Sequence, residues 1–507
     1  MAAAPLDHCY WTQTAAPTGF APLDGEATAD VAIIGGGIVG VIAARLLKDR
    51  GLTVALVEAE RVGRGVTGRS TAKVTAQHAL FLQRIAQQHG DDAARAYAEA
   101  NLAGVALIGE LVARHGLACD FERADSWVYA TTADGAEQLE SERAAAARAG
   151  LPMELVGETE LPFPVTGALR LPGQSQFHPV EFVARLAATI PGDGSQVYET
   201  SRATEWSEST VATAQGAIAA RRVIMATHLP LGQVGQFHAH NQPHMHAVMA
   251  VPVAPGRAPA GMFISADPPK RSLRRHRTAN GETVLILTGP TFKHGDAAAE
   301  RDGFHQLSSF AAEHFGHAGG GWRWSNEDYS PRDGLPYVGW AGPDGESPLV
   351  ATGFDAWGLS NGAAAATILA DLAEGRDNRW AACFDASRHS LTGVGRLLKT
   401  AAQVTGDLVG GHLRAHPAPS AASAEGDIVE IDGKAAGLHR GDDGALRAVS
   451  AVCTHMGCAL GWNPVDRTWD CSCHGSRFAA DGAVLHGPAV ERLAAVALAR
   501  QQEDAGQ

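Results

Sequence analysis

The sequence lacks the features that would carry a protein into a membrane or onto nucleic acid. It has no uninterrupted apolar stretch of about 18 residues, so we predict no membrane span. It has no basic tract, and its formal net charge of −14 disfavours nucleic acid and anionic membranes as partners. The N-terminal MAAAPLDHCYW has neither the positive nor the apolar region of a signal peptide, so we expect a cytoplasmic protein.

Cysteine is also scarce, and most of it lies near the C-terminus. Of seven cysteines, Cys9, Cys119 and Cys383 are scattered, and we interpret them as free thiols. No internal repeat is visible. A chain of 507 residues is too long for one hydrophobic core, so two or more domains are expected.

The most informative pattern is formed by Cys453 and His455, followed by Cys471 and His474. The spacing C-x-H and C-x-x-H is that of a Rieske iron-sulfur centre, in which two thiolates bind one iron and two imidazoles bind the other. A structural zinc ion could also take four such ligands, but it would leave Cys458 and Cys473 unexplained. The pattern therefore indicates an electron-transfer protein.

The boxes CTHMGC at 453–458 and CSCHGS at 471–476 resemble those of Rieske proteins, over roughly the last 80 residues. The resemblance implies that Cys453, His455, Cys471 and His474 hold a [2Fe-2S] cluster, with a disulfide between Cys458 and Cys473. It also implies that Gly487-Pro488-Ala489 is a third loop covering the cluster.

Two residues near the second box bear on the cluster's potential. By the same resemblance, Ser476 donates a hydrogen bond to a cluster sulfur. Phe478 stands where high-potential members have a tyrosine, and it has no hydroxyl to donate. Because hydrogen bonds to sulfur favour the reduced state, we predict a potential below that of the high-potential respiratory clusters.

A second pattern covers residues 30–60, which read as strand, glycine turn, helix, strand and acidic residue. Gly35, Gly37 and Gly40 form G-x-G-x-x-G, which permits a tight turn, a close approach to pyrophosphate and close helix packing. Glu58 ends the second strand, where a carboxylate can accept ribose hydroxyls. A bare glycine pattern is weak and Glu58 could simply be solvated, but this context favours dinucleotide binding.

Further segments resemble flavoproteins of the D-amino-acid-oxidase and glycine-oxidase superfamily over roughly residues 10–390. They are GRGVTGRSTAKVTAQH at 63–78, RRVIMATHLP at 221–230, RDGLPYVG at 332–339 and VATGFDAWGLSNGAAAATILADL at 350–372. With the Rieske boxes, the chain resembles a bacterial family of flavin-Rieske oxidoreductases, with γ-glutamylputrescine oxidases as more distant relatives. The implied fold is an α/β Rossmann-like FAD-binding domain with an interleaved antiparallel-sheet α+β substrate domain, plus a small all-β Rieske domain.

The resemblance assigns FAD contacts to the glycine turn, the loop after it and the ring-end turn. They are Gly35, Gly37, Ile38, Val39, Gly40, Glu58, Ala59, Thr67, Gly68, Ser70, Thr71, Thr227, Gly353, Gly358, Leu359 and Ser360. Ser70 and Thr71 could instead be capping residues. The cysteine or histidine that binds flavin covalently in some relatives is missing here, so we expect non-covalent FAD.

We place the oxidoreductase at 1–412, a Pro-, Ala- and Ser-rich linker at 413–425 and the Rieske domain at 426–507. Spaced apolar residues at 392–411 predict an amphipathic helix before the linker. Within the oxidoreductase, two sets of segments interleave. The FAD segments are about 25–80, 170–235 and 330–390, and the substrate domain is about 80–170 and 240–325.

The resemblance implies oxidation of an amine or amino acid at its C–N bond, giving an imine. The fused cluster suggests that electrons leave the flavin one at a time and pass to an external acceptor. An alternative is a reductase that feeds a partner oxygenase, but we find no second dinucleotide site. A non-catalytic redox sensor is another.

Candidate substrate residues are few, and the sequence assigns neither a general base nor a substrate. Arg274 could hold a substrate carboxylate, as an arginine of this sheet does in amino-acid oxidases, and Trp357 could flank the flavin. His78 and His178 could be pocket residues or buried core histidines. The stretch HAHNQPHMH, with His246 as its last member, could be polar strand, substrate pocket or metal site.

Overall fold

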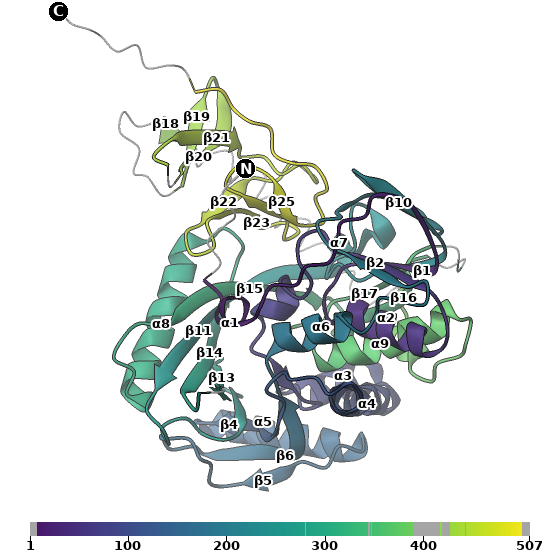
Figure 1. The fold of residues 1–507 in the computed structure, drawn as a ribbon. Coiled ribbons are helices and arrows are strands. Elements are labelled where there is room, and N and C mark those ends of the chain that lie inside the picture. The colour runs from purple at the N-terminus through teal and green to yellow at the C-terminus, as the bar shows by residue number, and fades with distance from the viewer. Residues whose placement is uncertain are drawn as a thin grey trace, which may run out of the picture.

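The computed structural model describes residues 8–278, 280–342, 345, 347–388, 416–417, 426–441 and 443–498. The helix predicted at 392–411 lies outside the described residues, as does the linker predicted at 413–425 except for the short strand β18 (His416–Pro417). Figure 1 shows a large body of two sheets with helices, and the C-terminal strands seated on one end of it.

A mainly parallel sheet forms one half of the large body. Its order is β16-β17-β10-β1-β2-β7, and only β16 runs antiparallel to its neighbour. Its central strands are apolar because both faces are buried, one of them against helices. The strands are β1 (Gly25–Ile34), β2 (Val54–Val57), β7 (Gln196–Tyr198), β10 (Gly216–Met225), β16 (Tyr337–Trp340) and β17 (Leu349–Thr352), with β8 (Ala203–Trp206) and β9 (Thr210–Thr213) added beside β10.

Helices pack on this sheet and on one another. Helix α2 (Ile38–Asp49) packs against α6 (Pro179–Ala187) and α9 (Ser360–Ala373), and α4 (Asp91–His115) packs against α9, α3 (Phe81–His89) and α5 (Ala133–Arg148). By length and composition alone α4 could cross a membrane, which is weak evidence for a span. Its buried residues, which include Tyr97, Asn101 and Ile108, face the neighbouring helices as those of a core helix do.

A second, mainly antiparallel sheet forms the other half, in the order β15-β11-β14-β13-β12-β4-β6-β3. Helix α8 (Ala297–Phe315) covers β11 and β14. The strands are β3 (Lys73–Val74), β4 (Glu122–Ala130), β6 (Gly167–Gln176), β11 (Asn241–Val253), β12 (Met262–Ser265), β13 (Ser272–Arg277), β14 (Thr283–Phe292) and β15 (Trp322–Pro331), with β5 (Glu154–Val156) beside β6.

Strand pairing crosses two of the predicted segment bounds. Strand β3, inside the predicted FAD segment 25–80, pairs with β6 in the second sheet. We placed a FAD segment from about residue 170, but β6 continues to Gln176 and pairs antiparallel with β4 in the second sheet. The second FAD segment therefore begins after β6. Short helices α1 (Tyr10–Thr14), α7 (Phe237–His240) and α10 (Ala381–Phe384), with the 3-10 turns η1 (Val66–Arg69) and η2 (Val234–Gln236), complete the large body.

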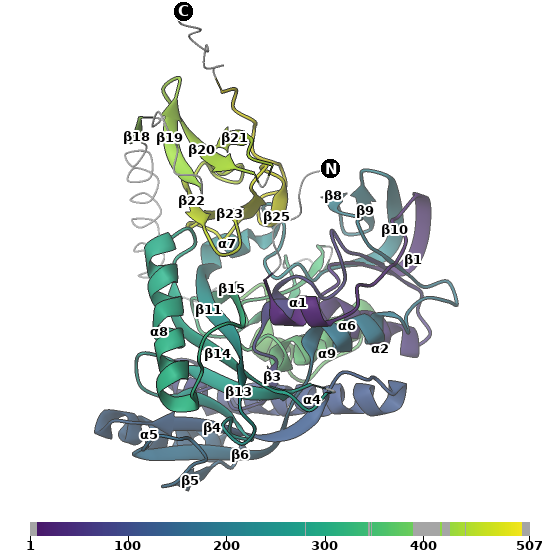
Figure 2. The ribbon, with the colours of Figure 1, turned by 60° about the vertical axis from the view of Figure 1, so that its left-hand side comes forward.

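The C-terminal unit is all β, as predicted, and consists of two small sheets. One contains β18, β19 (Asp427–Ile431), β20 (Lys434–Arg440) and β21 (Leu446–Ser450); the other contains β22 (Leu460–Asn463), β23 (Thr468–Cys471), β24 (Arg477–Ala479) and β25 (Val484–His486). The second sheet is built around the fully buried Trp469 and Phe478. Figures 1 and 2 agree that this second sheet lies against the large body, with the first sheet farther out.

Candidate functional site

A cavity of about 560 Å³ opens where β1 and β10 end and α2 begins. The sharp turn between β1 and α2 depends on glycine. Gly35 has a φ of +110°, and a Cβ on Gly40 would lie 2.0 Å from the Gly35 carbonyl oxygen. The N-cap residue of helix α2, Gly37, has no side chain, and the Thr67 hydroxyl accepts the Ile38 N–H at 3.1 Å. The N-terminus of the helix, with its partial positive charge, lines the cavity. A pyrophosphate fits such a cradle.

Glu58 braces this turn from the end of β2. Its Oε2 accepts the Gly36 N–H at 2.7 Å, and its Oε1 accepts the Glu60 N–H at 2.9 Å. Burial raises the pKa of the Glu58 carboxyl. The carboxyl lines the cavity beside Ala59, where the predicted ribose contact requires it.

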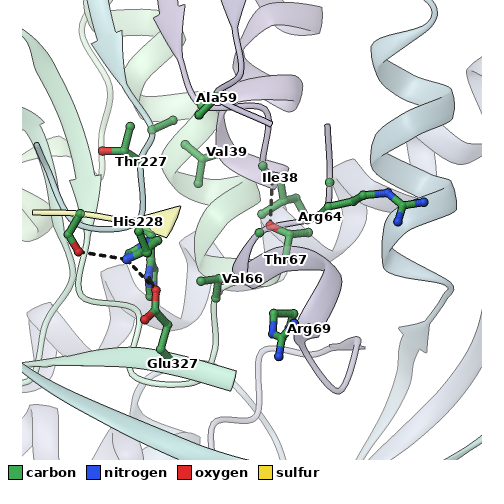
Figure 3. A pocket seen from close by; sticks show the side chains of 18 of the residues that line it. Ile38, Val39, Ala59, Arg64, Val66, Thr67, Arg69, Thr227, His228 and Glu327 are labelled. Carbon is green, nitrogen blue, oxygen red and sulfur yellow. Dashed lines mark hydrogen bonds and ion pairs between the residues drawn. The ribbon is translucent and has the colours of Figure 1, made fainter. Parts of the chain in front are cut away.

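Twelve of the sixteen predicted FAD residues line the cavity, and several appear in Figure 3. Gly40, Gly68, Gly353 and Ser360 do not line it and support its walls instead. A Cβ on Gly68 would lie 2.2 Å from the Gly63 carbonyl oxygen. The Ser70 hydroxyl donates to the Thr67 carbonyl and accepts the Ala72 N–H, so the capping alternative describes its hydrogen bonds.

Trp357 lines the cavity at the predicted ring end, and His78 supports it from behind. The two rings are stacked with centroids 4.6 Å apart. His78 is held by Tyr97, whose hydroxyl lies 2.6 Å from Nδ1, and by Ser360, whose hydroxyl lies 3.0 Å from Nε2. Burial lowers the pKa of His78 to about 3, so the ring is neutral at physiological pH. His78 therefore positions Trp357 and is itself outside the cavity lining.

Lys73 was not among the predicted site residues, although it lies in the loop that carried the family resemblance. It lines the cavity, with Nζ 5.8 Å from the centroid of the Trp357 ring. Its ammonium pairs with no carboxylate in the part of the chain that the structure describes. Burial, and then the charge of Arg274, lower the pKa of Lys73 to about 7. Whether a carboxylate lies near Lys73 depends on how distant segments fold together, and the sequence does not reveal it.

Arg274 was predicted as a carboxylate anchor, and the structure contradicts this. Its guanidinium donates to the carbonyls of Thr71 at 2.6 Å and Phe177 at 2.9 Å, and it lies 4.9 Å from the centroid of the Trp11 ring. Arg274 is buried and outside the cavity lining. Its donors serve main-chain carbonyls, so it ties the flavin loop to the second sheet.

The other histidine candidates, His178 and His246, also lie outside the cavity lining. His178 caps α6 by accepting the Glu181 N–H at 3.3 Å, which is the structural alternative. His246 is buried in β11 outside the cavity lining, and burial lowers its pKa to about 3. Among the described residues, the groups arranged to hold a metal ion do not include the HAHNQPHMH histidines.

The four predicted cluster ligands come together between the two loops of the C-terminal unit. Cys453 and Cys471 are buried free thiols, and Cys458 forms the predicted disulfide with Cys473. The Nδ1 atoms of His455 and His474 are buried and have no hydrogen-bond partner. Two free thiols and two unpartnered imidazole nitrogens are the donor set that a [2Fe-2S] cluster requires.

Ser476 lies where the resemblance placed a hydrogen-bond donor to sulfur. Its hydroxyl accepts the Ala489 N–H at 3.0 Å. Hydrogen bonds from Cys471, from the His455 N–H and from the Ser476 hydroxyl lower the pKa of Cys453 to about 7, against the effect of burial. The ring of Phe478 is fully buried in the same unit.

The histidine end of this donor set faces the large body. The ring centroid of His238, in α7, lies 4.9 Å from that of His455 and 5.0 Å from that of His474. The Tyr329 hydroxyl, at the end of β15, donates to the His474 carbonyl at 3.1 Å. His474 is only 7% exposed, so contacts from the large body surround the ligand end of the second box.

The cavity is shared by the two units. Its lining includes eight residues of the C-terminal unit, three of them from the predicted third loop and its neighbour: Asp466, Thr468, Arg477, Leu485, His486, Gly487, Ala489 and Val490. Arg69, in η1, forms an ion pair with Asp466 at 2.5 Å, and Asp466 also pairs with Arg477 at 2.8 Å. The segment that covers the cluster ligands therefore also closes the flavin cavity.

Comparisons with known proteins agree with these two sites. The family model described as FAD dependent oxidoreductase matches residues 30–372, and the Rieske [2Fe-2S] domain model matches residues 418–497. A Bacillus subtilis protein, YhfW, described as a Rieske 2Fe-2S iron-sulfur protein, is 32% identical over 96% of both chains. The Escherichia coli γ-glutamylputrescine oxidoreductase is 29% identical over 42% of this chain and 52% of its own length.

Solved structures are similar in fold. Glycine oxidase from Geobacillus kaustophilus matches 72% of this chain and 100% of its own, with a TM-score of 0.57 and 22% identity. L-Proline dehydrogenase from P. horikoshii matches 72% of this chain and 98% of its own, with a TM-score of 0.57 and 18% identity. The predictions of FAD and a Rieske cluster as cofactors are confirmed. The chain thus belongs to the FAD-dependent oxidoreductase family and carries a Rieske [2Fe-2S] domain over residues 418–497.

Proposed function

We propose that this protein oxidises an amine or amino acid at its C–N bond and passes the electrons, one at a time, to its own Rieske cluster and then to an external acceptor. The observation that carries the proposal is the shared cavity, because residues of the Rieske domain line the same space as the FAD-binding loops. When bound, FAD accepts a hydride from the carbon that bears nitrogen, and the cluster takes single electrons.

The relatives support the substrate class. One is named for γ-glutamylputrescine, and the similar folds include enzymes named for glycine and L-proline. All three named compounds carry an amino nitrogen. Because Arg274 is engaged by main-chain carbonyls, an amino-acid carboxylate would need another partner, and the structure favours an amine over an amino acid to that extent.

Lys73 supports the chemistry. Amine oxidation by hydride removal requires a neutral amine, so a group in the cavity must hold the proton that an ammonium substrate gives up. With its pKa lowered to about 7, the Lys73 Nζ can accept that proton near neutral pH. Trp357, backed by His78, forms the wall beside it.

The test is anaerobic mixing of the holoenzyme with amines, amino acids and N-methyl amino acids, and separately with NADH and NADPH. We expect flavin bleaching with a member of the amine panel, followed by the electron paramagnetic resonance signal of the reduced cluster. Reduction by a nicotinamide nucleotide and by none of the amines would identify a reductase instead. We also propose that the FAD is bound non-covalently, so acid precipitation should leave the flavin in the supernatant. We further propose that the protein is cytoplasmic.

A further inference from the structure

A buried carboxylate surrounded by three imidazoles stands where the two domains meet. Glu327, in β15, is 3% exposed. Its Oε1 lies 2.7 Å from His486 Nδ1 and 3.7 Å from His228 Nδ1, and its Oε2 lies 3.4 Å from His294 Nε2. Figure 3 shows His228 and Glu327 pointing toward each other inside the cavity. The three histidines come from three separate segments, and His486 belongs to the Rieske domain.

His228 has a carboxylate at both ring nitrogens. Besides Glu327 at Nδ1, the Asp328 Oδ1 lies 3.5 Å from Nε2. With a carboxylate oxygen 3.7 Å from one ring nitrogen and 3.5 Å from the other, charge attraction favours the imidazolium form of His228. Burial opposes the charge, but Asp328 and Glu327 outweigh it and raise the pKa of His228 to about 9. The His228 backbone has a φ of +67°, a left-handed conformation that few non-glycine residues adopt.

The group of residues around Glu327 contacts both cofactor sites. His228, Glu327, Asp328 and His486 line the flavin cavity, and Asp328 Oδ2 accepts the Ala356 N–H of the ring-end turn at 2.7 Å. On the other side, Tyr329 follows directly in β15 and donates to the His474 carbonyl. The other charged or titratable groups that face Glu327, Asp328 and His228 are His294, His244, Tyr329 and Arg477.

The proposed reaction releases a proton that a protein group near the domain junction must accept. Oxidation of an ammonium substrate to an iminium product releases two electrons and two protons, one from nitrogen before the hydride leaves and one carried by the hydride itself. A Rieske cluster carries the electrons away one at a time, whereas the protons must leave through protein groups. Lys73 Nζ can hold one of them. His486 lines the cavity and has 19% of its side chain accessible, so of the pair that it forms with Glu327 it is the residue that can pass a proton out of the buried site.

We propose that His228, Glu327 and His486 form a proton-holding site at the domain junction, which takes up the second proton when electrons cross from one domain to the other and releases it to solvent through His486. His228 stays charged and fixes Glu327, and the exchanging proton lies between the Glu327 carboxylate and His486 Nδ1. This inference rests on the proposed function, because it requires electron transfer between the two domains.

A metal ion is the competing occupant, since His228, Glu327 and His486 have ligand atoms within 4.8 Å of one another. The charges around His228 disfavour it, because a ligating imidazole must be neutral and Asp328 and Glu327 raise the pKa of His228 to about 9. Metal content therefore belongs to the test.

The experiment is histidine C2–H deuterium exchange, read by peptide mass spectrometry across a pH series, on the holoenzyme with both cofactors. It is done once oxidised and once reduced with dithionite, and the exposed His305 serves as an internal reference. We expect the protonation equilibrium of His486 to differ at least about threefold between the two redox states, while that of His305 does not change. In Glu327→Gln, the His228 equilibrium should shift at least about tenfold toward the neutral form, which is one pKa unit.

Identical His486 titrations in the two redox states would overturn the proposal, and this comparison needs no variant. One equivalent of zinc in the purified holoenzyme that is lost in His486→Gln would overturn it in favour of a metal site. Dithionite reduces both cofactors without a substrate. A failed amine panel with a redox-dependent His486 therefore refutes only the proposed substrate class, and the reverse result refutes only the proton site.

Discussion

At the scale of single residues, Lys73 and Glu327 line one cavity with opposite formal charges. Their partners decide which of the two side chains stays charged at neutral pH. Glu327 is surrounded by imidazoles, with His486 the strongest partner, and its pKa is held well below the ordinary range. Lys73 faces the Trp357 ring without a carboxylate partner in the described residues, and its pKa is lowered. Glu327 therefore stays charged at neutral pH, while Lys73 can release its proton.

Replacing Lys73 tests its role in substrate deprotonation. Because a lysine with a pKa of about 7 limits the rate on the acid side, kcat/KM of the wild type should fall below pH 7. Lys73→Met should lower kcat/KM about 100-fold or more and remove that acid limb. The exposed Lys434→Met is the matched control and should leave the profile unchanged. An acid limb that persists in Lys73→Met would assign the proton to another group.

His228 makes the protein's stability depend on pH in a defined direction. Its pKa is 6.5 ordinarily and about 9 in the fold, so the folded state binds the proton more tightly. The stabilisation is fully present below pH 6.5 and is lost as pH rises through 9, by up to about 3 kcal/mol. The difference in melting temperature between mildly acidic and alkaline buffer should therefore shrink in His228→Gln, but not in His305→Gln. Equal differences in all three proteins would contradict the His228 ion pairs.

The hydrogen bonds around the cluster set its potential. A tyrosine hydroxyl at position 478 would add a donor toward sulfur worth about 1 kcal/mol, or about 40 mV for one electron. Redox titration of Phe478→Tyr should therefore give a higher midpoint, whereas Ser476→Ala, which removes a donor, should give a lower one. If neither variant moved the midpoint, hydrogen bonding would not control this cluster.

At the scale of elements, the turn from β1 into α2 is the part of the site that local sequence determines most fully. A Cβ on Gly40 would meet main-chain oxygen, which cannot move without shifting the helix. Gly40→Ala should therefore cost about 1–3 kcal/mol and weaken FAD binding at least about tenfold. Fluorescence titration of the apoprotein with FAD measures this. Gly19→Ala, which meets nothing within 4 Å, is the control, and equal affinities in both variants would contradict the tight turn.

Sequence patterns predicted the elements whose chemistry is local. The glycine turn, the two cluster boxes, the disulfide and most of the cavity lining follow from residues close together in the chain. Lys73, Glu327 and His486 were missed because their roles depend on partners far away in the sequence. Arg274 was assigned wrongly for the same reason, since the carbonyls of Thr71 and Phe177 that occupy it come from loops far away in the sequence. The boundary near 170 failed because only strand pairing shows which sheet β6 joins.

At the scale of the whole molecule, the junction of the two domains is the feature that separates this chain from a simple oxidase. The cluster loops face α7 and β15, and the third loop closes the flavin cavity. The ion pairs from Arg69 through Asp466 to Arg477 join the FAD loop to the Rieske domain. This arrangement predicts that electrons pass between cofactors of the same chain.

The most direct test is anaerobic photoreduction of the flavin in the holoenzyme, with time-resolved detection of cluster reduction over a tenfold range of protein concentration. Transfer within one chain predicts a single first-order rate constant that does not change with concentration. A rate that rises in proportion to protein concentration, or a reduced flavin that persists beside an oxidised cluster, would contradict the account.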